Sequence, residues 1–258
     1  MAKENKYTIQ KITYLHQWTD HLFSFRITRD EGYKFIPGQF ARLGVKKEDD
    51  TIVWRAYSIV SADYDEELEF YSIVVPDGEF TQRLKNLKIN DEIYIDKTNY
   101  GLLTTDRFEN GKDLWFLSTG TGLAPFISIM YDFSIWEQYD KVILVHGVRE
   151  ANELAYQDKI NEFFTHEYYG DLVKDKLQYV KIVSRETFGA DLYGRITTLI
   201  ENGELEKFTN TPITIENSRI MICGNPQMVD DTRKCLGARG LTISKRANPG
   251  NMAVENLW

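Results

Sequence analysis

The fold is decided by the stretch Ser118-Thr119-Gly120-Thr121-Gly122-Leu123-Ala124-Pro125. It follows an apolar run at 114–117 and opens an apolar helix in which proline stands at a permitted early position. Glycines let the backbone approach a ligand closely, while free amides and the helix dipole favour a pyrophosphate. The spacing differs from G-x-G-x-x-G, and the alternative is a plain turn between strand and helix. The strand before it and the helix after it favour a nucleotide phosphate loop.

The rest of the chain divides into two patterns. Further apolar runs at 142–145, 178–183 and 219–223 predict buried strands of a parallel sheet with crossover helices. Upstream, the pattern predicts short strands at 7–9, 22–27, 39–43, 56–60, 68–74 and 92–95, with one short helix at 80–87. Their spacing favours an antiparallel barrel. The polar stretch 106–112 is the expected boundary, which gives domains of residues 1–108 and 109–258.

Composition, net charge and cysteine count exclude several classes of function. The 258 residues are 42% apolar, which is enough to fill a sizeable core. A net charge of −8 gives no general attraction to nucleic acid or anionic lipid. Two cysteines, Cys223 and Cys235, are too few for a disulfide scaffold, a four-cysteine zinc site or an ordinary iron-sulfur cluster, and the four histidines lack metal-ligand spacing, so no metal is expected. With no secretory signal and no membrane-spanning run, a cytoplasmic protein is expected.

Two motifs in the predicted barrel could hold a flavin nucleotide. Arg55-Ala56-Tyr57-Ser58 offers a cation, an aromatic face and a hydroxyl. Strand alternation puts Arg55 and Tyr57 on one face, where they could meet a phosphate and the flavin ring. Taken alone, an ordinary strand with outward side chains is the better interpretation. Gly78-Glu79-Phe80-Thr81 could cradle a second phosphate, although simple helix capping is the better interpretation of that segment alone.

Together, and in this order, the motifs resemble those of the ferredoxin-NADP reductase family in its bacterial form, over nearly the whole chain. Arg55-Ala56-Tyr57-Ser58 is similar to the R-x-Y-S flavin motif, and Thr119 to Pro125 is similar to the pyridine-nucleotide loop. Cys223-Gly224-Asn225-Pro226-Gln227-Met228 resembles the C-G-x-x-x-M segment beside the nicotinamide. Tyr71 to Val74, followed by Gly78 to Thr81, resembles the second flavin segment.

The resemblance implies an FAD-binding barrel followed by an NADP-binding α/β domain whose tail, 248–258, returns to the flavin. It implies that Ser58 and Cys223 flank the meeting point of flavin and nicotinamide, with Glu255 nearby for proton supply or nicotinamide positioning. Without the motif, Cys223 would simply be a buried cysteine at a strand end. The implied cofactor contacts are Arg55, Ala56, Tyr57, Ser58, Tyr71, Ser72, Ile73, Val74, Gly78, Phe80, Thr81, Thr119, Gly120, Thr121, Gly122, Ala124, Pro125, Gly224 and Met228.

Three arginines in the second half of the chain predict a preference for NADP(H) over NAD(H), because arginine binds the extra phosphate of NADP(H) with paired hydrogen bonds. Ser184 and Arg185 resemble the family's segment for the 2′-phosphate, and Arg195 resembles a second arginine used there. Arg149, which follows a predicted strand, is a further candidate. An NAD-selective site would more usually carry an acidic residue at the ribose.

The C-terminal residues resemble the bacterial ending. Trp258 is similar to the terminal tryptophan that packs on the FAD adenine. Leu257 stands where many relatives have a tyrosine over the isoalloxazine, which leaves open what covers that face of the flavin. The alternative for the whole tail is a frayed terminus.

The predicted function is an FAD-dependent oxidoreductase that exchanges electrons between NADPH, as hydride, and a one-electron carrier, ferredoxin or flavodoxin. The carrier would bind transiently to a monomer. Because such carriers are typically acidic, docking needs a local basic patch, for which the candidates are Arg42, Lys46, Lys47, Lys245 and Arg246. The alternatives are a reductase component serving an oxygenase or another redox partner, and a non-catalytic flavin or nucleotide sensor.

Overall fold

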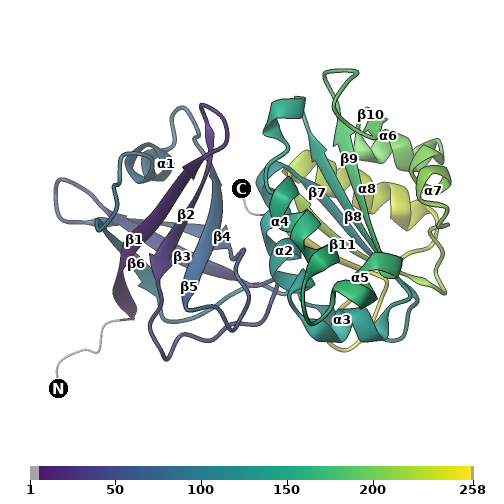
Figure 1. The fold of residues 1–258 in the computed structure, drawn as a ribbon, viewed down its shortest axis with the longest axis horizontal. Coiled ribbons are helices and arrows are strands. Elements are labelled where there is room, and N and C mark those ends of the chain that lie inside the picture. The colour runs from purple at the N-terminus through teal and green to yellow at the C-terminus, as the bar shows by residue number, and fades with distance from the viewer. Residues whose placement is uncertain (1–5, 257–258) are drawn as a thin grey trace.

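Two six-stranded sheets lie side by side along the long axis of the molecule (Figure 1). The computed structural model describes residues 6–256. The first sheet is antiparallel and is built from strands between residues 7 and 96, while the second is parallel and is built from strands between residues 113 and 256. The predicted fold class, an antiparallel barrel followed by an α/β domain, is therefore confirmed.

The antiparallel sheet curls into a barrel. Its strands run in the order β4-β3-β6-β1-β2-β5. The bridge between Ile59 and Phe70, with a Val60 N to Glu69 O hydrogen bond of 2.8 Å, brings the two outer strands together just beyond the end of β4. The elements are β1 (Tyr7–Gln17), β2 (Leu22–Thr28), β3 (Phe40–Lys46), β4 (Ile52–Ser58), β5 (Glu67–Ile73), the helix α1 (Glu79–Leu84) and β6 (Glu92–Asp96).

Alternation along the strands fills the barrel. In β5, Leu68 and Phe70 face the barrel core, whereas Tyr71 packs in the buried cluster of the second domain. β1 is longer than the predicted 7–9, because its first half pairs with β6 and its second half pairs with β2. The predicted helix at 80–87 is shorter and ends at Leu84.

The parallel sheet has the strand order β10-β9-β8-β7-β11-β12. Its long central strands are the apolar runs that the sequence predicted, and they are buried on both faces. The strands are β7 (Asp113–Thr119), β8 (Lys141–Val148), β9 (Leu177–Val183), β10 (Leu192–Tyr193), β11 (Ser218–Gly224) and β12 (Met252–Asn256).

Helices cover both faces of this sheet. One face packs against α2 (Ala124–Met130), α3 (Phe133–Gln138), α4 (Gln157–Glu162) and α5 (Gly170–Lys176). The other face packs against α6 (Ile196–Glu201), α7 (Glu204–Thr209) and α8 (Pro226–Ala238). Figure 1 shows α2 and α4 on the side nearest the barrel. Within residues 6–256, no helix combines the length and apolarity needed to cross a membrane.

The two domains share an apolar contact. Leu22, Val60 and Tyr71 of the barrel belong to the same buried cluster as Phe126 of α2. A hydrogen bond of 2.8 Å from Ser128 Oγ to Ser61 O crosses the same contact. The barrel is thus attached to the helix that follows the glycine-rich loop.

Phe70→Ala tests the barrel core. Phe70 is fully buried, with its ring centroid 5.4 Å from that of Phe25, so we expect a loss of about 3–5 kcal/mol in unfolding free energy. The measurement is urea unfolding followed by circular dichroism. Phe188→Ala is the control, because that side chain is 62% exposed. Equal effects of the two substitutions would contradict the assigned core.

Candidate active site

The predicted phosphate loop lies at the point where the strand order of the parallel sheet reverses. The chain runs outward from β7 through β8, β9 and β10, and then returns to the other side of β7 with β11. Ligands of open α/β sheets bind at the carboxyl ends of the strands at such a point. Residues 120–123 form one short 3-10 turn, and α2 begins at Ala124 with Pro125 in its first turn. Gly120 has φ +53° and open space where a Cβ would be, so its backbone is accessible.

The loop touches the end of β11. A Cβ on Gly122 would lie 2.3 Å from the carbonyl oxygen of Cys223, so only glycine fits there. Thr119 Oγ1 accepts a hydrogen bond of 2.9 Å from Asn225 N. Asn225 also caps α8, because its side chain accepts from the amides of Gln227 and Met228. The phosphate loop and the Cys223 segment therefore form one backbone unit.

Cys223 and Glu255 are neighbours on paired strands. They are register partners between β11 and β12. Burial, with a smaller contribution from the nearby Glu255, raises the pKa of the Cys223 thiol well above its ordinary range, so the thiol stays neutral. Burial also raises the pKa of Glu255 to about 7. The carboxyl is therefore protonated in slightly acidic solution and ionises near neutrality.

Gly101 and Phe40 connect this pair to the barrel. A Cβ on Gly101, which has φ +100°, would lie 2.8 Å from Glu255 Oε2 and 3.0 Å from the Phe40 ring. Phe40 is in turn the register partner of Ser58 at the end of β4. The structure thus brings the three predicted catalytic residues, Ser58, Cys223 and Glu255, to one junction between the domains.

Two polar atoms at this junction have no internal partner. Among the described residues, Ser58 Oγ and Glu255 Oε1 are buried without a hydrogen bond. Buried polar atoms normally have partners, so these two are available to a bound molecule. Together with the open backbone at Gly120, they fit a ligand that extends from the phosphate loop to the barrel.

In the first flavin motif, Arg55 and Tyr57 differ in exposure. Arg55 is exposed. Tyr57 is buried against the rings of Phe25, Phe70 and Phe80, and its hydroxyl lies 2.9 Å from Ser72 Oγ. Burial raises the pKa of Tyr57 to about 12. Tyr57 is therefore a neutral ring that the side chains of the barrel core hold in place.

Two side chains of the second flavin segment make contacts within the protein. Tyr71 lies on the face of β5 opposite Ser72 and packs against Tyr156, with ring centroids 5.2 Å apart. Thr81 Oγ1 accepts a hydrogen bond of 3.0 Å from Val75 N, so the hydroxyl predicted to face an anion is engaged in the turn before α1. Gly78 is needed in this turn, because a Cβ there would lie 2.7 Å from the same hydroxyl.

The remaining predicted flavin contacts flank these two side chains. Ile73 packs against the buried cluster that the barrel shares with the second domain, and Val74 packs against the barrel core. Phe80 is buried in that core.

The predicted phosphate arginines lie along one edge. Arg149 follows β8, Arg185 follows β9 and Arg195 follows β10, and all three are exposed. Arg185 N donates a hydrogen bond of 2.9 Å to Arg149 O, which holds two of the segments together. Ser184 Oγ donates to Val148 O at 3.1 Å, so this hydroxyl supports the loop.

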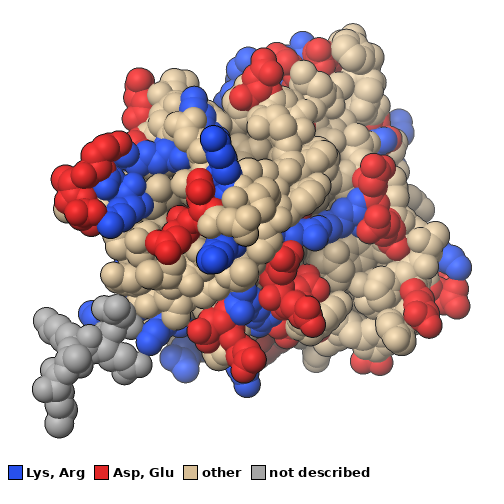
Figure 2. All heavy atoms as spheres, turned by 60° about the vertical axis from the view of Figure 1, so that its left-hand side comes forward, with Lys and Arg blue, Asp and Glu red and all other residues tan. Residues whose placement is uncertain are grey.

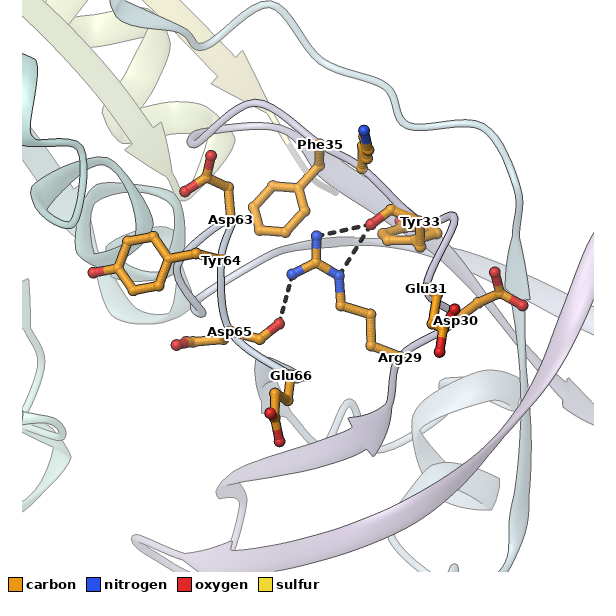
Figure 3. Close-up of a pocket in the computed structure, with 10 residues that line it drawn as sticks. Arg29, Asp30, Glu31, Tyr33, Phe35, Asp63, Tyr64, Asp65 and Glu66 are labelled. Atoms are coloured by element: carbon orange, nitrogen blue, oxygen red, sulfur yellow. Dashed lines mark hydrogen bonds between the residues drawn. The ribbon is translucent and has the colours of Figure 1, made fainter.

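A separate cavity of about 690 Å³ lies on the barrel (Figure 3). It is formed between the segments 29–35 and 63–66. Arg29 holds the two segments together, because it donates to Tyr33 O at 2.7 and 3.0 Å and to Asp65 O at 2.6 Å. None of the residues predicted for FAD or NADP lines this cavity.

Sequence reasoning missed Phe40 and Gly101. Nothing in the local pattern marks Gly101, which lies in the loop after β6, and Phe40 looked like an ordinary strand residue. Asn225 carried a signal, because asparagine before proline is typical of a helix N-cap. Leu257 and Trp258 lie outside the described residues. Within residues 6–256, no group of His, Cys, Asp and Glu could hold a metal ion.

Comparison with known proteins assigns both domains. The oxidoreductase FAD-binding domain matches residues 8–101, and the oxidoreductase NAD-binding domain matches residues 116–234. A ferredoxin-NADP reductase of Pseudomonas aeruginosa is 45% identical over 98% of each chain. The chain belongs to the ferredoxin-NADP reductase family.

Other members of the family are similar to this chain over nearly its whole length. A flavodoxin/ferredoxin-NADP reductase of Rhodobacter capsulatus is 39% identical over 96% of this chain and 92% of its own. The crystal structure of a ferredoxin-NADP reductase from Neisseria gonorrhoeae, with bound FAD and NADP, superposes with a TM-score of 0.91 at 36% identity, covering 99% of this chain and 100% of that one. The protein is therefore a flavoprotein oxidoreductase with one domain for FAD and one for the pyridine nucleotide.

Gly122→Ala tests the contact between the phosphate loop and Cys223. The new methyl group would overlap a backbone carbonyl, so we expect a loss of about 1–3 kcal/mol in stability and weaker NADP⁺ binding. The measurements are thermal unfolding and titration calorimetry. Gly237→Ala, in α8 with open space around its Cα, is the control and should keep NADP⁺ affinity unchanged. Unchanged affinity in both variants would overturn the role given to Gly122.

Glu255→Gln tests the raised pKa. The native pKa of about 7 lies above the ordinary 4.5, so the carboxyl contributes stability that is present below pH 4.5 and lost as the pH rises to 7. In the protein without cofactors, the stability of the wild type relative to E255Q should therefore fall across this window. The measurement is urea unfolding at several pH values, with the exposed Glu216→Gln as control. A constant difference would show an ordinary carboxyl.

Proposed function

We propose that this protein is an FAD-dependent NADPH oxidoreductase that exchanges electrons between NADPH and ferredoxin or flavodoxin. The observation that carries the proposal is the junction of Ser58, Cys223 and Glu255 between an FAD-binding and an NAD-binding domain. Relatives that match nearly the whole chain are named ferredoxin-NADP reductase and flavodoxin/ferredoxin-NADP reductase. When bound, FAD supplies the conversion between one hydride and two single electrons.

The chain's own residues would position the nucleotides. Gly120 and Gly122 allow the backbone to approach a pyrophosphate, and the exposed Arg185 and Arg195 would bind the 2′-phosphate. Cys223 is a small neutral thiol that can lie beside the nicotinamide without crowding it. Positioning matters more than acid-base chemistry for hydride transfer, since the reacting atoms must be held at close range.

Glu255 would hold a proton close to the meeting point of the cofactors. The raised pKa keeps this carboxyl protonated in slightly acidic solution. A group with a pKa near the working pH both gives and accepts protons readily. Ser58, whose hydroxyl has no internal partner, would donate a hydrogen bond to the cofactor on the barrel side.

The domain limits belong to the same proposal. We assign residues 1–108 to FAD and residues 109–258 to NADP(H), with the tail 248–258 returning to the flavin. Support comes from β12, which places Glu255 beside Cys223 and against Gly101 of the barrel domain. A cytoplasmic location is proposed as well.

The carrier would meet a surface of mixed charge. Figure 2 shows basic and acidic side chains interspersed on the barrel side of the molecule. Three of the predicted docking residues are paired with carboxylates: Lys46 with Asp50 at 2.7 Å, Lys47 with Glu79 at 3.3 Å and Arg42 with Asp96 at 3.8 Å. Their positive charge is therefore partly neutralised, and Lys245 and Arg246, which are exposed beside the tail, are the stronger candidates.

Anaerobic titration tests the proposal. NADPH should bleach the yellow holoenzyme faster and at lower concentration than NADH, and reduced enzyme should pass electrons to ferredoxin or flavodoxin.

Arg185→Ala should weaken NADPH binding about tenfold or more, because a charge-assisted contact to the phosphate is lost, and should leave the affinity for NADH unchanged. Arg233→Ala, which breaks an exposed ion pair on α8, is the control. Binding without flavin reduction would indicate a sensor, and equal response to both nucleotides would remove the preference for NADP.

A further inference from the structure

An ion pair crosses the contact between the two domains. Glu69 of β5 is 5% exposed, and its Oε2 lies 2.8 Å from Lys159 Nζ of α4, in the other domain. Arg26 Nε of β2, in the same barrel, lies 3.2 Å from the same oxygen. Burial alone would raise the pKa of Glu69, but the charge and hydrogen bond of Lys159, with smaller contributions that include Arg26, outweigh it, so the pKa is lowered and the carboxylate stays charged.

Such a pair resists separation. A buried carboxylate that loses a partner remains as a poorly compensated charge, which is costly. The two cations on Glu69 differ in one respect: Arg26 is bound within the barrel, whereas Lys159 belongs to the nucleotide domain. Movement of α4 away from β5 therefore breaks the Lys159 contact and leaves the Arg26 contact intact.

The segment that carries Lys159 also reaches the nucleotide edge. It begins at Arg149, whose amide donates to Glu153 Oε2 at 2.9 Å. Glu153 Oε1 lies 3.6 Å from His21 Nε2 in the barrel. Ala151 N donates to Glu186 Oε2 at 2.6 Å, beside the predicted phosphate arginine Arg185.

Tyr156 attaches the same segment to the barrel by packing. Its backbone is left-handed, with φ +63°, which turns the chain into α4. Its ring lies 5.0 Å from Trp18 and 5.2 Å from Tyr71, measured between centroids. Residues 149–159 thus link the NADP edge of the parallel sheet to the outer face of β2 and β5.

We propose that Lys159 and Glu69 are positioning residues that set the orientation of the nucleotide domain relative to the barrel. The apolar contact around Tyr156 permits sliding, while the ion pair between Lys159 and the buried Glu69 favours one alignment. That alignment is the one in which Cys223 and Glu255 meet Ser58. The inference rests on the proposed function, since its consequence is the rate of hydride transfer at that junction.

The test compares two variants that each remove one cation from Glu69. In the reconstituted holoenzyme, Lys159→Met should lower the rate of flavin reduction at saturating NADPH at least about tenfold, because a small misplacement of reacting groups has large effects. Arg26→Met should lower it much less. NADPH affinity should stay within a few-fold in both variants. Lys174→Met, which breaks an exposed ion pair of 2.8 Å on α5, is the control.

A double variant separates positioning from the cost of a buried charge. E69Q/K159M removes both charges, so we expect its melting temperature to lie closer to the wild-type value than that of K159M. Its rate of flavin reduction should stay as low as that of K159M. Small-angle scattering should show a changed domain arrangement in K159M and in the double variant, and none in R26M. The primary isotope effect with deuterated NADPH should also change in K159M.

Some outcomes would overturn the proposal. They are equal rate losses in K159M and R26M, recovery of the rate in the double variant, or scattering curves identical to wild type. Failure of the wild-type holoenzyme to be reduced by NADPH would instead contradict the proposed function, and the scattering comparison would still decide whether Lys159 and Glu69 orient the domains.

Discussion

The close approach of two backbone segments governs the site. Gly122 lies so near the carbonyl of Cys223 that a single methyl group would overlap it. Because main-chain atoms are on both sides, no rotamer change can relieve the overlap. The contact joins the ends of β7 and β11 at the point where the strand order reverses, and the pairing of β11 with β12 then places Glu255. One steric condition thus fixes the phosphate loop, the thiol and the carboxyl relative to each other.

Electrostatics at the junction suits hydride transfer. The Cys223 thiol is kept neutral by burial, and Glu255 is protonated below about pH 7 for the same reason. A hydride carries negative charge toward the acceptor, so a site with two anions at this point would oppose it. Burial here has a chemical effect as well as a structural one, because desolvation penalises the charged form of both groups.

The sequence predicted the fold because its signals were local. Continuous apolar runs marked β7, β8, β9 and β11, and the glycine-rich loop marked the switch point. The second half of β1 was missed, because the exposed Tyr14 and Leu15 and a register shift between Ile12 and Tyr14 interrupt the alternation of apolar and polar residues. Gly101 and Phe40 were missed for a different reason: they matter through contacts between segments far apart in the chain, which no local pattern carries. The orientation of Tyr71 depends likewise on the strand register.

Besides the hydrogen bond from Ser128 to Ser61, the contact between the domains combines apolar packing with an ion pair, and these two interactions have different roles. Apolar packing around Tyr156 and Tyr71 supplies attraction, but it has no preferred direction and allows one domain to slide on the other. The Lys159 and Glu69 pair adds little net attraction, because desolvation of both charges offsets their Coulomb energy. Its value lies in the steep cost of any alignment that separates the charges. A reductase whose two cofactors lie on different domains needs that selectivity more than it needs additional stability.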